Sequence, residues 1–217
     1  MLELAAFDFD GVLADTEPLH KRAKEILSQR LGAVTPLNYE AYVGRPNRDF
    51  WLDLIAANHL EGVNIEEMEA RQYDVIVELT EEVGLRPTPG VETVLDYLAE
   101  RGVRLTVCSS SVRSYLEKML PLLGLGGRFE FLVGGDEVAR KKPSPDVYLK
   151  ALELTSVPAE KALAVEDSAA GVAAALAAAM AVIGFQNPGS GHQNLSEAHA
   201  VINRFDTLPR LMRLFVI

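Results

Sequence analysis

The sequence contains almost no cysteine, since Cys108 is the only one among 217 residues. A single cysteine cannot form an internal disulfide, which agrees with a reducing compartment. No apolar stretch approaches the roughly 20 residues of a membrane span, and no basic leader precedes the first apolar segment. We therefore expect a cytoplasmic protein without a membrane partner, whose one cysteine is buried and inert.

Positive charge is also scarce, with 21 lysines and arginines against 31 aspartates and glutamates, a net charge of −10. No basic run is long enough to follow a nucleic-acid backbone, which argues against a nucleic-acid partner. An acidic protein that handles an anionic substrate must gather its cations locally or recruit a metal ion. The length allows one sizeable core, or a core with a small inserted domain.

Short apolar runs that alternate with helical patterns predict an α/β fold with a parallel sheet covered on both faces. In such sheets, ligands bind beyond the carboxyl ends of the strands. The expected strands are Leu4 to Phe9, Arg104 to Cys108, Phe129 to Val133, Ala162 to Val165, Ala181 to Ile183 and Ala200 to Ile202. The expected helices between them are Val91 to Glu100, Val112 to Leu123, Asp146 to Leu154 and Ala169 to Ala179.

The region from Asp15 to Arg86 breaks this alternation, because it contains helical patterns only. The expected helical segments are Glu17 to Leu31, Asn38 to Tyr42, Asn47 to His59 and Ile65 to Val83. A stiff, proline-rich connection then returns the chain to the sheet. We interpret the region as a helical insert that serves as a lid. The alternative is that these helices form one layer of a single domain.

Two aspartates end the first predicted strand, followed by Gly11. Positions two apart on a strand project to the same face, so Asp8 and Asp10 are expected side by side. Two such carboxylates repel each other unless a cation or a shared proton joins them. The alternative is an ordinary strand end with acidic turn residues.

Polar side chains also follow the next three predicted strands. Ser109 follows the second strand, Lys142 lies after the third, and Glu166 with Asp167 follows the fourth. Taken singly, Ser109 and Asp167 stand where helix caps occur, and Lys142 could be a solvated loop lysine. Together with Asp8 and Asp10, these residues would place two pairs of carboxylates, a hydroxyl and an ammonium at one edge of the sheet.

This combination suits a phosphoryl-transfer site with Mg²⁺, which prefers a few oxygen ligands. One aspartate would attack phosphorus, Lys142 and the metal would neutralise charge, and Ser109 would donate a hydrogen bond to the phosphoryl oxygens. The second aspartate would protonate the leaving oxygen and then take a proton from water.

Four motifs, in this order, resemble those of the haloacid dehalogenase superfamily, in its phosphatase and phosphomutase branch with a helical cap. The motifs are Asp8-Phe9-Asp10-Gly11-Val12, Ser109 after an apolar strand, Lys142-Pro143-Ser144-Pro145-Asp146 and Glu166-Asp167-Ser168-Ala169-Ala170-Gly171. The resemblance implies a Rossmann-like parallel-sheet core, residues 1–14 and 87–217, with an inserted α-helical cap domain, residues 15–86.

The resemblance also implies a role for each acidic residue. Asp8 corresponds to the nucleophile and a Mg²⁺ ligand, and Asp10 to the acid/base, which also offers its backbone carbonyl to the metal. Asp167 corresponds to a metal ligand, and Glu166 to a residue that binds the metal directly or through water. The dehalogenases of the superfamily lack the second aspartate, because a carbon–halogen leaving group needs no proton; its presence here favours a phosphate ester.

Substrate selection is expected from the cap. The segment Asp15 to His20 resembles the start of the cap in β-phosphoglucomutase, where residues matching Thr16 and His20 couple substrate binding to the acid/base. The other predicted substrate-binding residues are Gly44, Asn47, Arg48, Arg71 and Ser110. Alignment on Gly44 places Asn47 where the mutase has a phosphate-binding arginine, with Arg48 one position later.

We therefore expect a Mg²⁺-dependent phosphatase of a small phosphorylated metabolite, a sugar or polyol phosphate, acting through an aspartyl-phosphate. The alternatives are a β-phosphoglucomutase-type phosphomutase and a non-catalytic binding protein of the same fold. The sequence leaves the oligomeric state open, and a monomer is compatible with it. Phe50, Trp51 and Leu54 are expected to pack between cap helices rather than to form a partner surface.

Overall fold

A computed structural model describes residues 1–43 and 45–208. Contacts within the chain divide it into two compact units. The core unit contains Met1–Asp15 and the chain from Arg86 onward, and the second unit, called the insert below, is Thr16–Leu85. Asp15 and Arg86 thus belong to the core unit, one residue from the junctions expected from the sequence.

A sheet of six parallel strands forms the centre of the core unit as far as the structure describes it. The strands lie in the order β3-β2-β1-β4-β5-β6, so the chain proceeds in opposite directions on the two sides of β1. Their bounds are β1 (Leu4–Phe7), β2 (Arg104–Cys108), β3 (Phe131–Val133), β4 (Ala162–Glu166), β5 (Ala181–Phe185) and β6 (Ala200–Ile202). The α/β fold class predicted from the sequence is confirmed.

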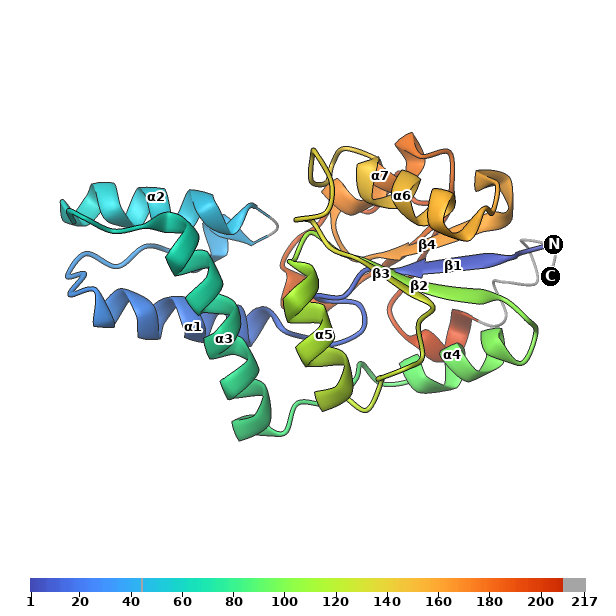
Figure 1. Cartoon of the computed structure of the whole chain (residues 1–217), viewed down its shortest axis with the longest axis horizontal. Helices are drawn as coiled ribbons and strands as arrows, with labels where there is room; N and C mark the ends of the chain where they lie inside the picture. The colour runs from blue at the N-terminus through green and yellow to red at the C-terminus, as the bar shows by residue number, and fades with distance from the viewer. Residues whose placement is uncertain (44, 209–217) are drawn as a thin grey trace. The chain divides into compact units, whose positions relative to one another are not determined.

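Helices cover both faces of this sheet (Figure 1). On one face lie α4 (Val91–Ala99) and α5 (Arg113–Leu122); on the other lie α6 (Asp146–Thr155) and α7 (Ala169–Ala177). All four residues of β1 are buried, which explains why the strand has no polar alternation. The described part of the unit also contains the short 3-10 helices η2 (Ala159–Lys161), η3 (Pro188–Ser190) and η4 (Phe205–Thr207).

The central strands are in register, so their carboxyl ends meet at one edge of the sheet. Phe7 of β1 pairs with Val107 of β2 and with Val165 of β4. The residues that follow these positions therefore lie close together, whatever their separation in sequence. Strand β1 ends at Phe7 rather than at the predicted Phe9, and β4 extends through Glu166.

The insert contains only helical elements among its described residues: α1 (Glu17–Arg30), η1 (Tyr39–Tyr42), α2 (Asn47–Asn58) and α3 (Ile65–Val83). Local signals fix the ends of α3, because the side chain of Asn64 caps its first turn and Gly84 ends it in the left-handed conformation. Phe50, Trp51 and Leu54 are buried, which confirms that they pack inside the protein.

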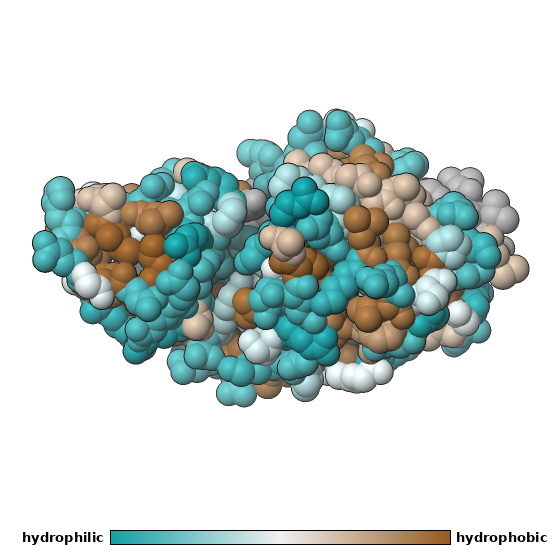
Figure 2. Space-filling view, turned by 45° about the horizontal axis from the view of Figure 1, so that its top comes forward, coloured by the Kyte–Doolittle hydropathy of each residue, from teal (hydrophilic) through white to brown (hydrophobic). Residues whose placement is uncertain are grey.

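Cys108 is buried at the end of β2, as expected. Burial raises the pKa of its thiol to about 12, so the thiol is inert at neutral pH. None of the described helices is both long and apolar enough to cross a membrane. Figure 2 shows one face of the molecule, on which hydrophilic side chains surround separate hydrophobic patches.

Candidate active site

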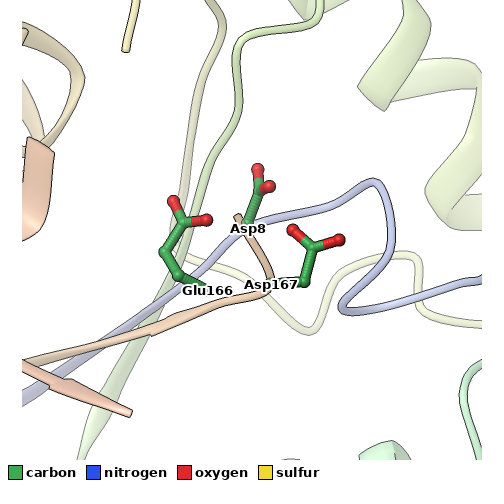
Figure 3. Close-up of side chains that lie close together, drawn as sticks. All are labelled: Asp8, Glu166 and Asp167. Atoms are coloured by element: carbon green, nitrogen blue, oxygen red, sulfur yellow. The ribbon is translucent and has the colours of Figure 1, made fainter. Parts of the chain in front are cut away.

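Three carboxylates converge where β1 and β4 end (Figure 3). Asp8 follows β1, Glu166 is the last residue of β4, and Asp167 follows it. All three are buried, and each offers an oxygen within 4.8 Å of the oxygens of the other two. The parallel register of β1 and β4 brings these residues together although they are far apart in the sequence.

The side chain of Lys142 reaches this cluster from the segment after β3. Its Nζ lies 3.0 Å from Oδ1 of Asp8 and 2.5 Å from Oε1 of Glu166. Nζ also donates a hydrogen bond of 2.8 Å to the backbone carbonyl of Cys108. Only 4% of the Lys142 side chain is exposed, so the solvated-loop alternative is excluded.

The buried charges influence one another strongly. Burial raises the pKa of Asp8 to about 7; the negative charge of Glu166 adds to this, while Lys142 opposes it. Burial by itself would lower the pKa of Lys142, but the charges of Asp8 and Glu166 outweigh burial and raise it. Lys142 is therefore an ammonium ion, and any further cation at the cluster would favour the ionised form of Asp8.

Glu166 is held by groups that the sequence interpretation did not include. Tyr148, on α6, donates a short hydrogen bond to Oε1 of Glu166. The carboxylate packs against Gly171, where a Cβ atom would overlap it. Oε2 of Glu166 is buried and has no hydrogen-bond partner among the described residues, so it is available as a ligand.

Asp167 is fixed by Ser190, which donates a short hydrogen bond to Oδ2. Gly11 lies against the same carboxylate with a φ of 77°, and a Cβ atom there would overlap both Asp167 and Ser190. The glycine that follows the two aspartates in sequence is thus required twice, by its backbone conformation and by the close approach of Asp167.

Asp8 and Asp10 do not share a strand face as the sequence predicted, although the negative charge of Asp10 contributes to the raised pKa of Asp8. The strand ends at Phe7, and the chain then turns, with the N–H of Leu13 donating to the carbonyl of Phe9. The carboxylate of Asp10 accepts hydrogen bonds from Ser111 Oγ at 2.6 Å and from the Tyr115 hydroxyl at 3.2 Å. Strand alternation does not apply in the turn, so the two carboxylates occupy different environments.

The serines after β2 divide into separate roles. Ser109 is 1% exposed, and its Oγ accepts a hydrogen bond of 3.0 Å from the N–H of Ser111. It directly follows Cys108, whose carbonyl binds Lys142. Ser110 packs its backbone carbonyl against Gly135. The predicted phosphate contact of Ser109 and substrate contact of Ser110 stay predictions.

The carboxylate cluster fits a divalent metal ion. Among the described residues, three buried carboxylates face one ammonium, which leaves negative charge that a cation would balance. The donors are all hard oxygens, and Asp8, Glu166 and Asp167 would hold the ion. Asp10 contributes no carboxylate to this cluster.

Within the insert, the structure brings two of the predicted substrate-binding residues together. Gln72 of α3 lies between His20 of α1 and Asn47 of α2, with its Nε2 3.1 Å from His20 Nδ1 and 3.1 Å from Asn47 Oδ1. Thr16 is fully buried where α1 begins.

The two predicted arginines lie in exposed ion pairs within the insert. Arg48 pairs with Glu66 at 2.9 Å, and Arg71 pairs with Glu67 at 2.7 Å. Gly44 lies outside the described residues. The substrate-binding roles of all these insert residues stay predictions.

Residues missed by the sequence interpretation include Ser111, Tyr115, Tyr148 and Ser190. Ser111 belongs to the serine run that was recognised, and Ser190 follows β5 as the other polar residues follow their strands. Extending the strand-end argument to the fifth strand would have indicated the polar segment after Phe185, which contains Ser190, without singling out this residue. The two tyrosines gave no signal, because each lies in an ordinary apolar helix pattern.

The sequence pattern of a family described as haloacid dehalogenase-like hydrolase matches residues 5–185 of this chain. The chain belongs to this family. The resemblance inferred from the four motifs, the fold class and the hydrolase class are therefore confirmed.

Several relatives within this family have names or solved structures. A protein of Thermotoga maritima named phosphorylated carbohydrates phosphatase is 32% identical over 178 residues, 82% of each chain. Protein CbbY of Cereibacter sphaeroides is 31% identical over 219 residues, 96% of this chain and 94% of its own. The crystal structure of CbbY from Rhodobacter sphaeroides in complex with phosphate has a TM-score of 0.84 at 29% identity, over 96% of both chains.

Proposed function

We propose that this hydrolase is a phosphatase of a small phosphorylated metabolite, with sugar or polyol phosphates as the preferred class and Mg²⁺ as its metal. The observation that carries the proposal is the division of two nearby aspartates between two environments. Asp8 lies among Lys142, Glu166 and Asp167, whereas Asp10 is held by Ser111 and Tyr115. Two carboxylates kept in different surroundings suit two chemical roles.

Asp8 is the proposed nucleophile. One of its carboxylate oxygens would form a bond to phosphorus while the bond from phosphorus to the ester oxygen breaks, which gives an aspartyl-phosphate. Lys142 favours the ionised form of Asp8 that this attack requires, because its ammonium lies 3.0 Å from Oδ1. When bound, Mg²⁺ would neutralise charge on the phosphoryl oxygens.

Asp10 is the proposed acid and base. It would give a proton to the departing ester oxygen, and then accept one from the water that cleaves the aspartyl-phosphate. Ser111 and Tyr115 both donate to its carboxylate, which favours the ionised form needed for the second step.

The relatives support the substrate class. One is named as a phosphatase of phosphorylated carbohydrates. A crystal structure of CbbY from Rhodobacter sphaeroides in complex with xylulose-1,5-bisphosphate is 28% identical, with a TM-score of 0.83 over 94% of this chain. These names favour phosphate release from a sugar phosphate over a role as a binding protein.

The proposal is tested by incubating the protein with Mg²⁺ and a panel of sugar and polyol phosphates that includes β-glucose 1-phosphate. Free phosphate and glucose 6-phosphate are followed together. We expect phosphate release that is lost when a chelator removes the metal. Isomerisation faster than phosphate release would instead identify a phosphomutase.

The nucleophile is tested by Asp8→Asn, with Asp206→Asn as a matched substitution at an exposed site of the core unit. We expect the first to reduce turnover on the order of 10⁴-fold and the second to leave it unchanged. Circular dichroism would show that both variants are folded. Full activity in Asp8→Asn would overturn the mechanism.

A further inference from the structure

Tyr148 is a side chain of the core unit that has no role in the proposed chemistry. It lies on α6, is fully buried, and donates its hydroxyl hydrogen to Oε1 of Glu166. The ammonium of Lys142 lies 2.5 Å from the same oxygen and 5.2 Å from the centre of the Tyr148 ring. Tyr148 therefore contacts both a proposed metal ligand and the lysine beside the proposed nucleophile.

The two oxygens of the Glu166 carboxylate have different surroundings. Oε1 is occupied by the Tyr148 hydroxyl and the Lys142 ammonium. Oε2 is buried and has no hydrogen-bond partner within residues 1–43 and 45–208. Figure 3 shows this carboxylate beside those of Asp8 and Asp167. A buried acceptor is costly to leave without a partner, so Oε2 is the oxygen that a bound cation would satisfy.

The glutamate side chain does not fix this arrangement by itself. Its terminal torsion is broad and two-fold, so the two oxygens exchange places unless neighbours hold them. Gly171 lies against the carboxylate, but a Cβ atom there would overlap both oxygens, so this contact does not distinguish them. Lys142 is shared with Asp8, whereas the hydroxyl of Tyr148 is directed at Glu166. Tyr148 thus supplies the directional contact that holds Oε1.

A carboxylate with one oxygen occupied offers a cation only the other. Mg²⁺ has a small octahedral shell, keeps several waters and is held through few protein oxygens. Ca²⁺ takes more oxygen ligands, often including both oxygens of one carboxylate. Holding Glu166 by Oε1 therefore suits Mg²⁺ and works against Ca²⁺.

We propose that Tyr148 is a positioning residue for the metal site, which holds Oε1 of Glu166, leaves Oε2 to the cation and thereby favours Mg²⁺ over Ca²⁺. Tyr148 itself touches neither metal nor substrate and acts through Glu166. The inference rests on the proposed function, because it concerns the metal of the same site.

Tyr148→Phe tests the proposal, because it removes the hydroxyl and keeps the ring. Calorimetric titration of the metal-free protein with Mg²⁺ and with Ca²⁺ gives the two Kd values without substrate. We expect the Mg²⁺ Kd to rise by about 10-fold to 100-fold, as for other groups that hold a metal ligand, and the Ca²⁺ Kd to rise by a smaller factor. An unchanged Mg²⁺ Kd, or an equal rise for both ions, would overturn the proposal.

The matched control is Tyr97→Phe on α4 of the same unit. Tyr97 is half-buried, and its ring lies under the guanidinium of Arg101. We expect both Kd values to stay as in the wild-type protein, and circular dichroism would show that both variants are folded.

A second measurement uses the wild-type protein and does not depend on the folding of Tyr148→Phe. Infrared difference spectra with ¹³C-labelled glutamate, recorded with and without metal, distinguish ligation through one carboxylate oxygen from ligation through two. Glu166→Gln assigns the bands of Glu166. We expect ligation through one oxygen with either ion. Ligation of Ca²⁺ through both oxygens of Glu166 in the wild-type protein would contradict the proposal.

These outcomes separate the inference from the proposed function. A protein that shows the expected Kd values and spectra but hydrolyses no phosphate ester would refute the proposed function alone. Phosphate release by the wild-type protein, with an unchanged Mg²⁺ Kd in Tyr148→Phe, would refute the role of Tyr148 alone.

Discussion

Lys142 in the core unit and Lys24 in the insert are both buried, with 4% of the Lys142 side chain and 3% of Lys24 exposed. Lys142 lies against two carboxylates and a backbone carbonyl. The ammonium of Lys24 instead lies 5.0 Å from the ring centres of both Tyr39 and Phe50. The same side chain is thus buried among full negative charges in one unit and between aromatic faces in the other.

The two environments move the lysine pKa in opposite directions. Burial lowers the pKa of Lys24 to about 8, and the charge of Glu17 opposes this only partly. At Lys142, burial acts in the same direction, but two adjacent carboxylates outweigh it and raise the pKa. Aromatic faces stabilise a cation less than carboxylates do. Burial alone therefore does not identify a catalytic lysine; the partners decide its charge.

The largest effect is expected from removing the charge in the core unit. Lys142→Met leaves Asp8 and Glu166 buried without their cation, so we expect the free energy of unfolding to fall by about 3–5 kcal/mol. Phosphatase activity should fall by about 10²-fold to 10³-fold, which is the effect of losing one donor that stabilises charge in the transition state. Urea unfolding and a phosphate-release assay measure the two effects.

The neighbouring Lys141 is exposed and provides the control for this substitution. Lys141→Met should change neither stability nor activity measurably. A Lys142→Met variant that keeps full activity would remove Lys142 from the mechanism.

Replacing the buried lysine of the insert, Lys24, with methionine should raise the free energy of unfolding, whereas Lys142→Met lowers it. Lys24→Met replaces a buried ammonium with an apolar side chain of similar length between Tyr39 and Phe50. We expect the free energy of unfolding at pH 7 to rise by about 1–3 kcal/mol, since the charge of Glu17 offsets only part of the cost of burying the ammonium. Urea unfolding compares it with Lys21→Met, an exposed position of the same helix. Destabilisation confined to Lys24→Met would show that the cation–aromatic contacts outweigh burial.

The smallest expected effect is the pH dependence of the stability difference between Lys24→Met and the wild-type protein. The pKa of Lys24 is about 8 in the folded protein and 10.5 as its ordinary value, so between these values the unfolded state binds more protons. The contribution of Lys24 to the stability of the wild-type protein therefore rises with pH across this window. The advantage of Lys24→Met should shrink from pH 8 to pH 10.5, as measured by unfolding at several pH values. A constant advantage would mean that Lys24 is not titrating.

The sequence predicted the strands and helices closely because their signals are local. The apolar runs of β1 and β4 are buried on both faces, and Asn64 and Gly84 mark the ends of α3. The predicted strand end was wrong where a turn replaces the last residues of the apolar run. The run through Phe9 looks like a continuous strand, but the strand ends at Phe7, and the N–H groups of Val12 and Leu13 donate to the carbonyl of Phe9 in a local turn.

By itself, the sequence predicted the parallel sheet and the helical insert. It also predicted the four residues of the buried charge cluster, which are Asp8, Lys142, Glu166 and Asp167. Spacing and order carry that information, since parallel strands bring their carboxyl ends to one edge. Only the tertiary structure decided the partners of these groups: Tyr148 on Glu166, Ser190 on Asp167, and Gln72 on His20. Those contacts join residues from different elements, and the pKa and orientation of a side chain depend on which neighbours the packing supplies.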